Sequence, residues 1–406
     1  MKWEKVKLGE LYEVHNGLSK AGEFFGEGYP FLTFSTVFNN YFIPKQITDL
    51  VQSTEKEQES YSIRRGDVFV TRTSETSDEL GMSCVALKDY PMATYNGFTK
   101  RMRPITNRVF PEYIGYYMRL PSFRGEFRAF STMTTRASLR NEDLLGLEVE
   151  LPPIEIQKQI AEILTTYDNL IENNQKQIKL LEEAAQRLYK EWFVDLNFPG
   201  HENMKIVDGV PEGWQIASIA DICDTVGGGT PSTKIQSYYE KGDILWVTPT
   251  DITRNFSLAL LDTEKKITPE GLKNSSAKML PAETILMTSR ASVGFFGMCK
   301  YEVCTNQGFI SCIPKKENLQ MYLLFNLKSR VEEIRQKAGG STYLEISKTV
   351  FRELKIILPK DEVLAKYQKN VHDIFDEIYC RTEMIKNLVD MRNRLLPKLM
   401  SGEVEV

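Results

Sequence analysis

The chain repeats one order of sequence motifs, and this repeat constrains its fold more than any other feature. WEKVKLGEL begins at Trp3 and WQIASIADI at Trp214, while the related phrases TYNGF and CTNQGF end at Phe98 and Phe309. Each pair is 211 positions apart. A period this long indicates a duplicated domain, because the repeats of solenoid proteins are about 20 to 50 residues long.

Each copy is followed by a long stretch with helical periodicity. Apolar residues recur at helical spacing from Ile156 to Trp192 and again from Val363 to Leu395. With no Gly or Pro before Pro199, the first helix is roughly 57 Å long at about 1.5 Å per residue. Because such a helix is too long to be buried inside one small domain, we expect the two helices to pack on each other as an antiparallel coiled coil.

This order predicts an α+β fold with two tandem, β-rich domains, each followed by a long helix, and with pseudo-two-fold symmetry between the halves. Asn173 and Asn174 interrupt the first apolar seam and either fix the register of the coiled coil or lie on its exposed face. The predicted domains cover residues 1–152 and 197–360, and the predicted helices cover 153–196 and 361–406. The clearest predicted strands are Tyr29–Phe34, Asp67–Thr71, Ser83–Leu87, Ile244–Thr248, Thr284–Thr288 and Phe309–Ile313.

Composition excludes several classes of protein. No apolar run approaches the roughly 18 residues that span a bilayer, and the N-terminus lacks the pattern of a secretory signal, so we expect a cytoplasmic protein. The six cysteines include no CxxC pair, which favours reduced thiols in the core. Three scattered histidines, His15, His201 and His372, predict no zinc site.

The charge distribution is uneven. A net charge of −4 counts against a nucleic-acid partner, since DNA-binding domains usually carry a basic excess. However, residues 98–140 hold nine basic and two acidic residues, and residues 273–337 hold ten basic and five acidic ones. One such run is often a solvated surface, whereas its recurrence in both copies favours a functional basic surface.

Both copies also place arginine among small hydroxyl residues at a strand end, which are side chains suited to guanine edges and phosphates. A plain surface strand end or a flexible turn is the alternative for each. The candidate DNA contacts at the strand ends and following turns are Arg72, Thr73, Ser74, Asn96, Lys100, Arg101, Ser289, Arg290, Ser292, Asn306 and Gln307. Further candidates in polar loops are Thr134, Thr135, Arg136, Thr230, Ser232, Lys234, Thr250, Ser341, Thr342 and Tyr343.

Familiar catalytic motifs are missing from the sequence. It contains no GxGxxG, no HExxH, no GxSxG and no Asn/Asp-Pro-Pro-Tyr/Phe motif of an amino-methyltransferase. The glycine-rich stretch at residues 227–234 lacks the order of a Walker A loop. The E-x-K spacing at Glu264 and Glu353 occurs in some nucleases but is common by chance. We therefore predict no catalytic residues and no bound metal.

The whole chain resembles the DNA specificity subunits of type I restriction-modification systems. The helical strings LPPIEIQKQIAEIL and LLEEAAQRLYKEWFVDLNFPGHE carry this resemblance most specifically. ETILMTSRASVG, TNQGF and the terminal LLPKLMSGEVEV add to it.

The resemblance implies a non-catalytic subunit in which two target-recognition domains each read one half of a bipartite DNA site. The helices would set the spacing and dock two methyltransferase (modification) subunits. It further implies ATP-dependent restriction subunits as partners and a role in defence against foreign DNA. S-adenosylmethionine, ATP and Mg²⁺ would be used by those partners, and no cofactor would be bound by this chain. Two alternatives stay open: an inactive or silent-copy scaffold, and a stand-alone DNA-modifying enzyme.

Overall fold

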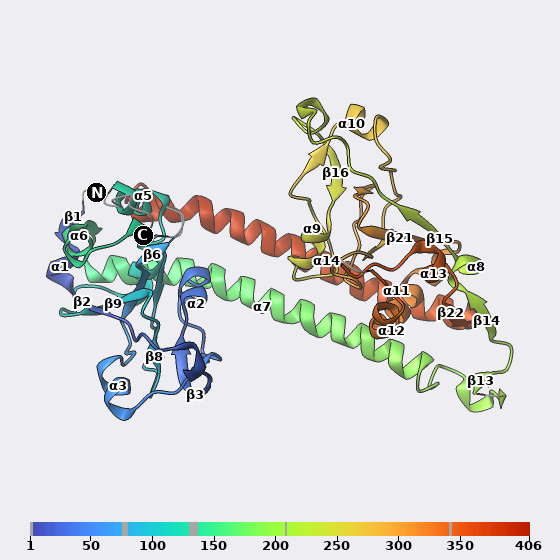
Figure 1. Ribbon diagram of the computed structural model, residues 1–406, viewed down its shortest axis with the longest axis horizontal. Helices are drawn as coiled ribbons and strands as arrows, with labels where there is room; N and C mark the ends of the chain where they lie inside the picture. Colours follow the sequence, from blue (N-terminus) through green and yellow to red (C-terminus); the bar gives the residue numbers. More distant parts are fainter. Residues whose placement is uncertain (1–2, 75–79, 130–136, 208, 341–342) are drawn as a thin grey trace. The chain divides into compact units, whose positions relative to one another are not determined.

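The computed structural model describes residues 3–74, 80–129, 137–207, 209–340 and 343–406. The chain divides into two compact units, one formed by Met1–Asn169 with Val389–Val406 and the other by Leu170–Leu388. Each unit contains part of both long helices, α7 (Ile154–Phe193) and α14 (Asp361–Met400) (Figure 1). Both helices lie inside the ranges that the apolar periodicity predicts.

The first unit is built on a four-stranded antiparallel sheet in the order β2-β9-β5-β7. A three-stranded sheet, β4-β3-β8, contains one parallel pair, β3 with β8. Two shorter pairs, β1 with β11 and β6 with β10, complete the strands. The strand bounds are β1 Glu4–Lys7, β2 Tyr12–Asn16, β3 Phe25–Leu32, β4 Leu50–Val51, β5 Val68–Thr71, β6 Thr73–Ser74, β7 Ser83–Val85, β8 Thr94–Tyr95, β9 Thr99–Pro104, β10 Ala137–Ser138 and β11 Glu148–Leu151.

The second unit repeats the two larger sheets in the same strand order, and it adds a short hairpin of β12 with β13. Its four-stranded sheet has the order β15-β21-β18-β19, and its three-stranded sheet, β17-β16-β20, again contains one parallel pair, β16 with β20. β14 pairs with β22 as β1 pairs with β11. The strand bounds are β12 Ile206–Val207, β13 Val210–Pro211, β14 Gln215–Ser218, β15 Cys223–Gly227, β16 Ile244–Val247, β17 Lys266–Ile267, β18 Ile285–Thr288, β19 Phe296–Gly297, β20 Cys304–Thr305, β21 Phe309–Pro314 and β22 Lys355–Leu358. The predicted duplication is thus confirmed at the level of topology, and all six predicted strands are present.

Short helices connect the strands, and side-chain caps fix where several of them begin. In α3 the Thr54 hydroxyl accepts from the Glu57 amide while the Glu57 carboxylate accepts from the Thr54 amide, and Ser218 and Asp221 form the same capping box at α8. The helix bounds in the first unit are α1 Leu8–Leu11, α2 Phe34–Asn39, α3 Glu55–Ser60, α4 Pro111–Tyr117, α5 Pro121–Ala129 and α6 Asn141–Gly146. Those in the second are α8 Ile219–Ile222, α9 Pro249–Thr253, α10 Pro269–Lys273, α11 Gln320–Ser329, α12 Val331–Gln336 and α13 Lys348–Arg352. Single 3-10 turns lie at Gly22–Phe24, His201–Asn203, Gln236–Tyr238 and Glu317–Leu319.

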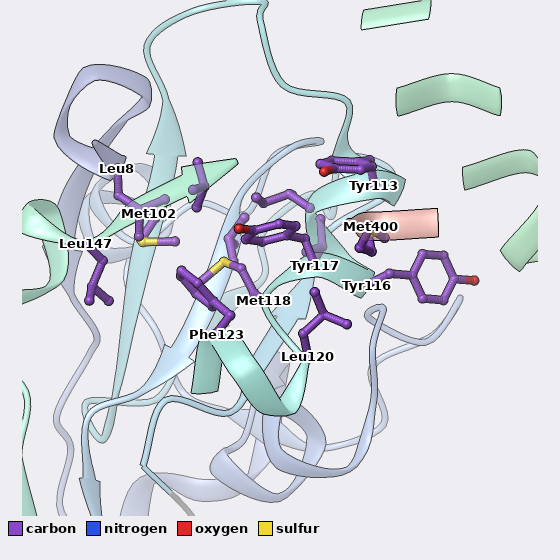
Figure 2. Packing of buried hydrophobic residues seen from close by; sticks show 14 of the residues in the cluster. Leu8, Met102, Tyr113, Tyr116, Tyr117, Met118, Leu120, Phe123, Leu147 and Met400 are labelled. Carbon is purple, nitrogen blue, oxygen red and sulfur yellow. The ribbon is translucent and has the colours of Figure 1, made fainter. Parts of the chain in front are cut away.

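The core of the first unit joins its sheet to both long helices. Leu8, Met102 and Tyr117 are buried together, and Met400 from the end of α14 lies in the same cluster (Figure 2). Ile160 and Leu164 contribute the apolar face of α7 to this cluster. Within this unit, the apolar residues of both helices therefore pack against the domain.

Within each unit α7 and α14 contact each other, and in the second unit the contacts run in antiparallel order. In the first unit the Arg392 guanidinium donates to the Asp168 carboxylate. In the second, Arg381 Nη1 donates to Asn174 Oδ1 at 3.2 Å, and farther along α7 the Phe193 ring lies 4.8 Å from the Tyr367 ring. Asn174 is buried, so it faces α14 rather than solvent.

An aromatic cluster joins the helices to the domain in the second unit. The Phe193 ring is 4.7 Å from the Tyr322 ring and 4.8 Å from the Tyr367 ring. Tyr367 is fully buried, burial raises the pKa of its hydroxyl, and among the described residues that hydroxyl has no hydrogen-bond partner.

This cluster gives a stability prediction with a built-in control. We expect Tyr367→Ala to lower the free energy of unfolding by about 3–5 kcal/mol, because it removes a fully packed aromatic ring. Tyr367→Phe is expected to leave stability unchanged or slightly raised, because it deletes only a buried hydroxyl without a partner. Urea unfolding of the two variants checks this, and equal losses in both would contradict it.

Candidate nucleic-acid interface

Two strands of the second unit end, and a third begins, at the same edge of the four-stranded sheet. β15 ends at Gly227 opposite Ile310, and β18 ends at Thr288 opposite Phe309, where β21 begins. The adjoining segments 228–234, 289–292 and 305–308 therefore meet at this edge. Residues 343–345 join them, because the Ala291 amide donates to the Leu344 carbonyl at 2.8 Å. We call these four segments the loop edge of the second unit.

The glycine-rich segment is pressed against the turn that holds Asn306. A Cβ atom on Gly228 would lie 2.1 Å from the Thr305 carbonyl oxygen, so only glycine fits there. The Gly229 amide donates to the same carbonyl at 2.9 Å, and the Trp246 indole donates to the Gly229 carbonyl at 3.0 Å. Gly228 and Gly229 are thus packed against the rest of the edge.

Two polar side chains are aligned across this contact. The Thr230 hydroxyl hydrogen-bonds to the exposed Gln307 side chain. Asn306 Oδ1 accepts from the Gly308 amide at 2.8 Å and so stabilises its own turn. Thr230 and Gln307 therefore present polar groups outward, while Asn306 shapes the backbone.

Arg290 is held by neighbours on both sides. Its guanidinium carbon lies 4.4 Å from the centre of the Tyr343 ring, and its Nε is 3.4 Å from a Glu345 carboxylate oxygen. Its side chain is 35% exposed. The sequence placed Arg290 and Tyr343 in separate candidate loops, and the structure brings them together.

The other candidates in this unit differ in accessibility. Ser289 is buried and Ser292 half-buried, while Ser232 and Lys234 are exposed. Thr250 is half-buried on α9, where its neighbour Pro249 lies close to Gly308. Ser289 therefore acts through its backbone, since its amide donates to the Gly308 carbonyl at 2.8 Å and its carbonyl accepts from the Ile346 amide at 3.0 Å.

Lys234 gives a prediction about charge. It is exposed and, among the described residues, makes no ion pair or hydrogen bond, so its charge is available to a phosphate. If the loop edge binds DNA, Lys234→Gln should weaken binding uniformly across sequences and reduce the slope of log affinity against log salt by about 1. Titrations of the assembled complex at several salt concentrations measure this. Lys205→Gln, which alters an exposed lysine outside the loop edge, is the control, and an equal effect there would contradict the assignment.

The first unit has the same edge built from different side chains. β2 ends at Asn16 opposite Lys100, and β5 ends at Thr71 opposite Thr99. A Cβ atom on Gly17 would lie 2.1 Å from the Asn96 carbonyl oxygen, the same close approach as at Gly228. We call Asn16, Gly17, Arg72 and residues 96–98 the loop edge of the first unit.

Arg72 and Phe98 are the prominent side chains there. Arg72 Nη1 lies 3.5 Å from Asn16 Oδ1, at the outer limit of a hydrogen bond. Phe98 is 58% exposed, although a phenylalanine is usually buried. Asn96 is half-buried, and its Oδ1 accepts from the Phe98 amide at 2.7 Å.

The hydrogen bonds correct the sequence pairing at this turn by one residue. Asn96 binds the amide two residues on, as Asn306 does, so Phe98 corresponds to Gly308 and not to Phe309. The amide of Arg72 donates to the Phe98 carbonyl as that of Ser289 donates to Gly308. Arg72 therefore matches Ser289 and not Arg290, so the two arginines are not equivalent.

Lys100 and Arg101 lie inside the first unit. Lys100 is 5% exposed and its ammonium group donates to Asn141. Burial, and next the nearby Arg72 charge, lowers the pKa of Lys100. Arg101 is 3% exposed, its Nη1 donates to the Ser62 carbonyl at 2.7 Å, and burial lowers its pKa. Because both cations are already bound by the protein, we leave them out of the proposed interface.

Other members of the first basic stretch are also used internally. Arg103 Nη2 lies 2.6 Å from the fully buried Asp67 carboxylate, and the hydrogen bond to that carboxylate raises the pKa of Arg103. Arg119 donates to the carbonyls of Ser83, Val37 and Asn40 at 2.7, 2.7 and 2.6 Å. The local basic excess therefore stabilises the fold in part and is not simply a DNA-facing surface.

Several candidates fall outside what the structure describes. Thr134, Thr135, Arg136, Ser341 and Thr342 lie outside the described residues. Thr73 and Ser74 are described only as strand β6, which pairs with β10.

Sequence reasoning missed two side chains at these edges. Asn16 ends β2 beside Arg72, and Glu345 lies beside Arg290. The predicted DNA contacts were basic, hydroxyl and amide residues, so an acidic residue such as Glu345 was not among them. The pairing of strand ends, which brings together positions tens of residues apart, is what reveals both.

One group of described residues offers ligand atoms to a cation. Atoms of Glu283, His372 and Asp376 lie within 4.8 Å of one another. However, the two ring nitrogens of His372 face the carboxylates of Glu283 and Asp376 at 3.1 and 3.4 Å, and Lys300 lies 2.6 Å from Asp376. Because these contacts already account for the arrangement, we assign no metal to it.

Comparison with known proteins identifies the family. The family model for the type I restriction modification DNA specificity domain matches residues 1–183 and 211–390. This chain belongs to that family. A specificity subunit of the type I restriction enzyme HindI from Haemophilus influenzae is 24% identical, with 99% of each chain covered. The MjaIX specificity subunit from Methanocaldococcus jannaschii is 37% identical over 42% of this chain and 39% of its own length.

The fold of this type I specificity subunit agrees with a solved relative. The crystal structure of the S subunit from M. genitalium superposes with a TM-score of 0.59 at 15% identity, covering 98% of this chain and 96% of that one. No helix among the described residues is both long and apolar enough to cross a bilayer. Recognition of a DNA sequence is the function that defines the family.

Proposed function

We propose that the chain reads a bipartite, asymmetric site in double-stranded DNA, with one loop edge for each half. Residues 1–152 and 197–360 act as two target-recognition domains. The observation that carries this proposal is the repeated edge, where two strands end, a third begins and a glycine lies against the carbonyl of a polar turn. The two edges carry different side chains at matching positions, such as Phe98 and Gly308. Each edge therefore reads a different half-site.

The long helices, covering residues 153–196 and 361–406, are proposed to form an antiparallel coiled coil that fixes the distance between the halves. The Arg392–Asp168 pair in one unit supports contact between the helices. In the other unit Asn174 meets Arg381 and Phe193 meets Tyr367, so residue numbers rise along α7 as they fall along α14, which supports an antiparallel pair. Asn174 then acts as a polar register residue in an otherwise apolar seam.

The chain is proposed to be non-catalytic and to act through partners. Two modification subunits, using S-adenosylmethionine, dock on the helices and methylate adenine, and restriction subunits use ATP and Mg²⁺. Adenine lies inside the duplex stack, so the modification subunits flip it out. This division of roles agrees with the side chains of the two loop edges. Among the described residues, these edges hold arginine, hydroxyl and amide groups rather than an organised acid–base site.

Co-expression with the neighbouring modification subunit, followed by sequencing of methylated adenines in host DNA, tests the proposal. We expect one motif with two fixed halves and a constant gap, absent from cells that lack this chain. A stable complex without methylation would indicate an inactive scaffold, and the absence of a complex would contradict the docking proposal.

A further inference from the structure

Arg290 occupies a fixed backbone position at the loop edge of the second unit. It forms an antiparallel bridge with Glu345, so the two side chains leave neighbouring backbones at the same point. The flanking amides of Ala291 and Ile346 donate to the carbonyls of Leu344 and Ser289 at 2.8 and 3.0 Å. These backbone hydrogen bonds hold the two residues opposite each other.

The side-chain contacts among the described residues engage one face and the Nε side of the guanidinium group. Tyr343 packs against it at 4.4 Å, and Glu345 lies at the Nε side at 3.4 Å. Among the described residues, the two Nη nitrogens have no hydrogen-bond partner. They form the donor fork that binds guanine O6 and N7 bidentately.

We propose that Arg290 and Glu345 together read one G·C base pair in the half-site of the second unit. Arg290 donates to guanine O6 and N7, Glu345 accepts from the paired cytosine N4, and Tyr343 positions Arg290 through its ring face. This rests on the proposed function, and it names a base pair that the sequence alone could not. An A·T pair does not fit, because it presents no pair of adjacent acceptors to the fork.

The Glu345 carboxylate favours a base edge over a phosphate as the ligand of Arg290. A cation that anchors a phosphate works by its unpaired charge, whereas the charge of Arg290 is compensated by Glu345 at 3.4 Å. A second anion beside that carboxylate would be repelled. The pairing with Glu345 uses Nε of Arg290 and leaves the two Nη donors in place. Base edges are therefore the favoured partner.

The first unit lacks this pair. Its residue matching Arg290 is Thr73, which pairs with Ser138 in the β6–β10 bridge, and its arginine, Arg72, lies one position earlier. The same G·C reading is therefore expected in one half of the site only.

Methylation mapping of the complex carrying Glu345→Gln or Arg290→Lys tests this. For the wild type we expect a fixed G·C pair in one half-site. Either substitution should reduce discrimination at that pair about ten- to a hundredfold, with the other half unchanged. Asp262→Asn, which breaks the exposed Lys266–Asp262 pair outside the loop edge and the long helices, is the control and should leave both halves unchanged.

The outcomes separate this inference from the proposed function. Bipartite methylation without a fixed G·C pair in one half, or with a pair that neither substitution relaxes, overturns the role of Arg290 and Glu345 alone. A uniform fall in methylation at all sites also overturns it, because that result indicates a phosphate contact or a structural role. No bipartite methylation by the wild-type complex is instead a failure of the proposed function.

Discussion

Replacing Gly228 with alanine should abolish reading of one half-site and leave the other intact. The added Cβ atom would lie 2.1 Å from the Thr305 carbonyl oxygen and 2.2 Å from that of Asn306, both backbone atoms that cannot swing away. The glycine-rich segment and the Asn306 turn must then separate, which costs about 1–3 kcal/mol of stability. If the displaced edge no longer reads about two base pairs, each worth about 1–3 kcal/mol, affinity for the complete site should fall by roughly thirtyfold or more.

Gly17→Ala should have the matching effect on the other half, because its Cβ atom would approach the Asn96 carbonyl oxygen at 2.1 Å. Binding to duplexes with one half scrambled assigns each loss to a half. Gly125→Ala is the control, since nothing lies within 4 Å of its Cβ position on α5. Loss of both halves by a single variant would show that the two edges do not act separately.

Replacing Asp67 with asparagine should destabilise the first unit by about 3–5 kcal/mol, because Arg103 would keep a buried charge without its partner. Arg103 donates to both oxygens of this carboxylate, at 2.8 and 2.6 Å, and the Arg64 amide donates to it at 2.7 Å. Asp67 is fully buried. Chemical unfolding monitored by fluorescence measures the loss.

The exposed pair of Glu4 and Arg108, 2.7 Å apart, supplies the control. Glu4→Gln should leave the free energy of unfolding nearly unchanged, because water screens an exposed ion pair. A loss for Asp67→Asn no larger than that for Glu4→Gln would mean that Arg103 finds another partner or reaches solvent.

The architecture followed from the sequence because its signals are local or periodic. Helical spacing of apolar residues predicted α7 and α14, and the repeated motifs predicted two copies of one topology. Gly66 and Asp67 marked the start of β5 at Val68. These signals reflect the periodicity of helices and strands and the residues that turns require, and both can be read from a single sequence.

The side chains of the site were harder to predict because strand pairing, and not sequence distance, decides their neighbours. Glu345 meets Arg290 across 55 positions only because their segments form a bridge. Arg101 looked like a surface cation but is buried, with its Nη1 on a carbonyl. The one-residue shift between Phe98 and Phe309 likewise became visible only from the hydrogen bonds of the Asn96 and Asn306 turns.

The central claim is that two loop edges read two half-sites at a fixed separation. The direct measurement is the affinity of the assembled complex for duplexes that carry its methylation motif with the gap lengthened by one or two base pairs. We predict that each change weakens binding about as strongly as scrambling one half-site. Affinity that does not depend on the gap, or specificity that resides in one half alone, would contradict the claim.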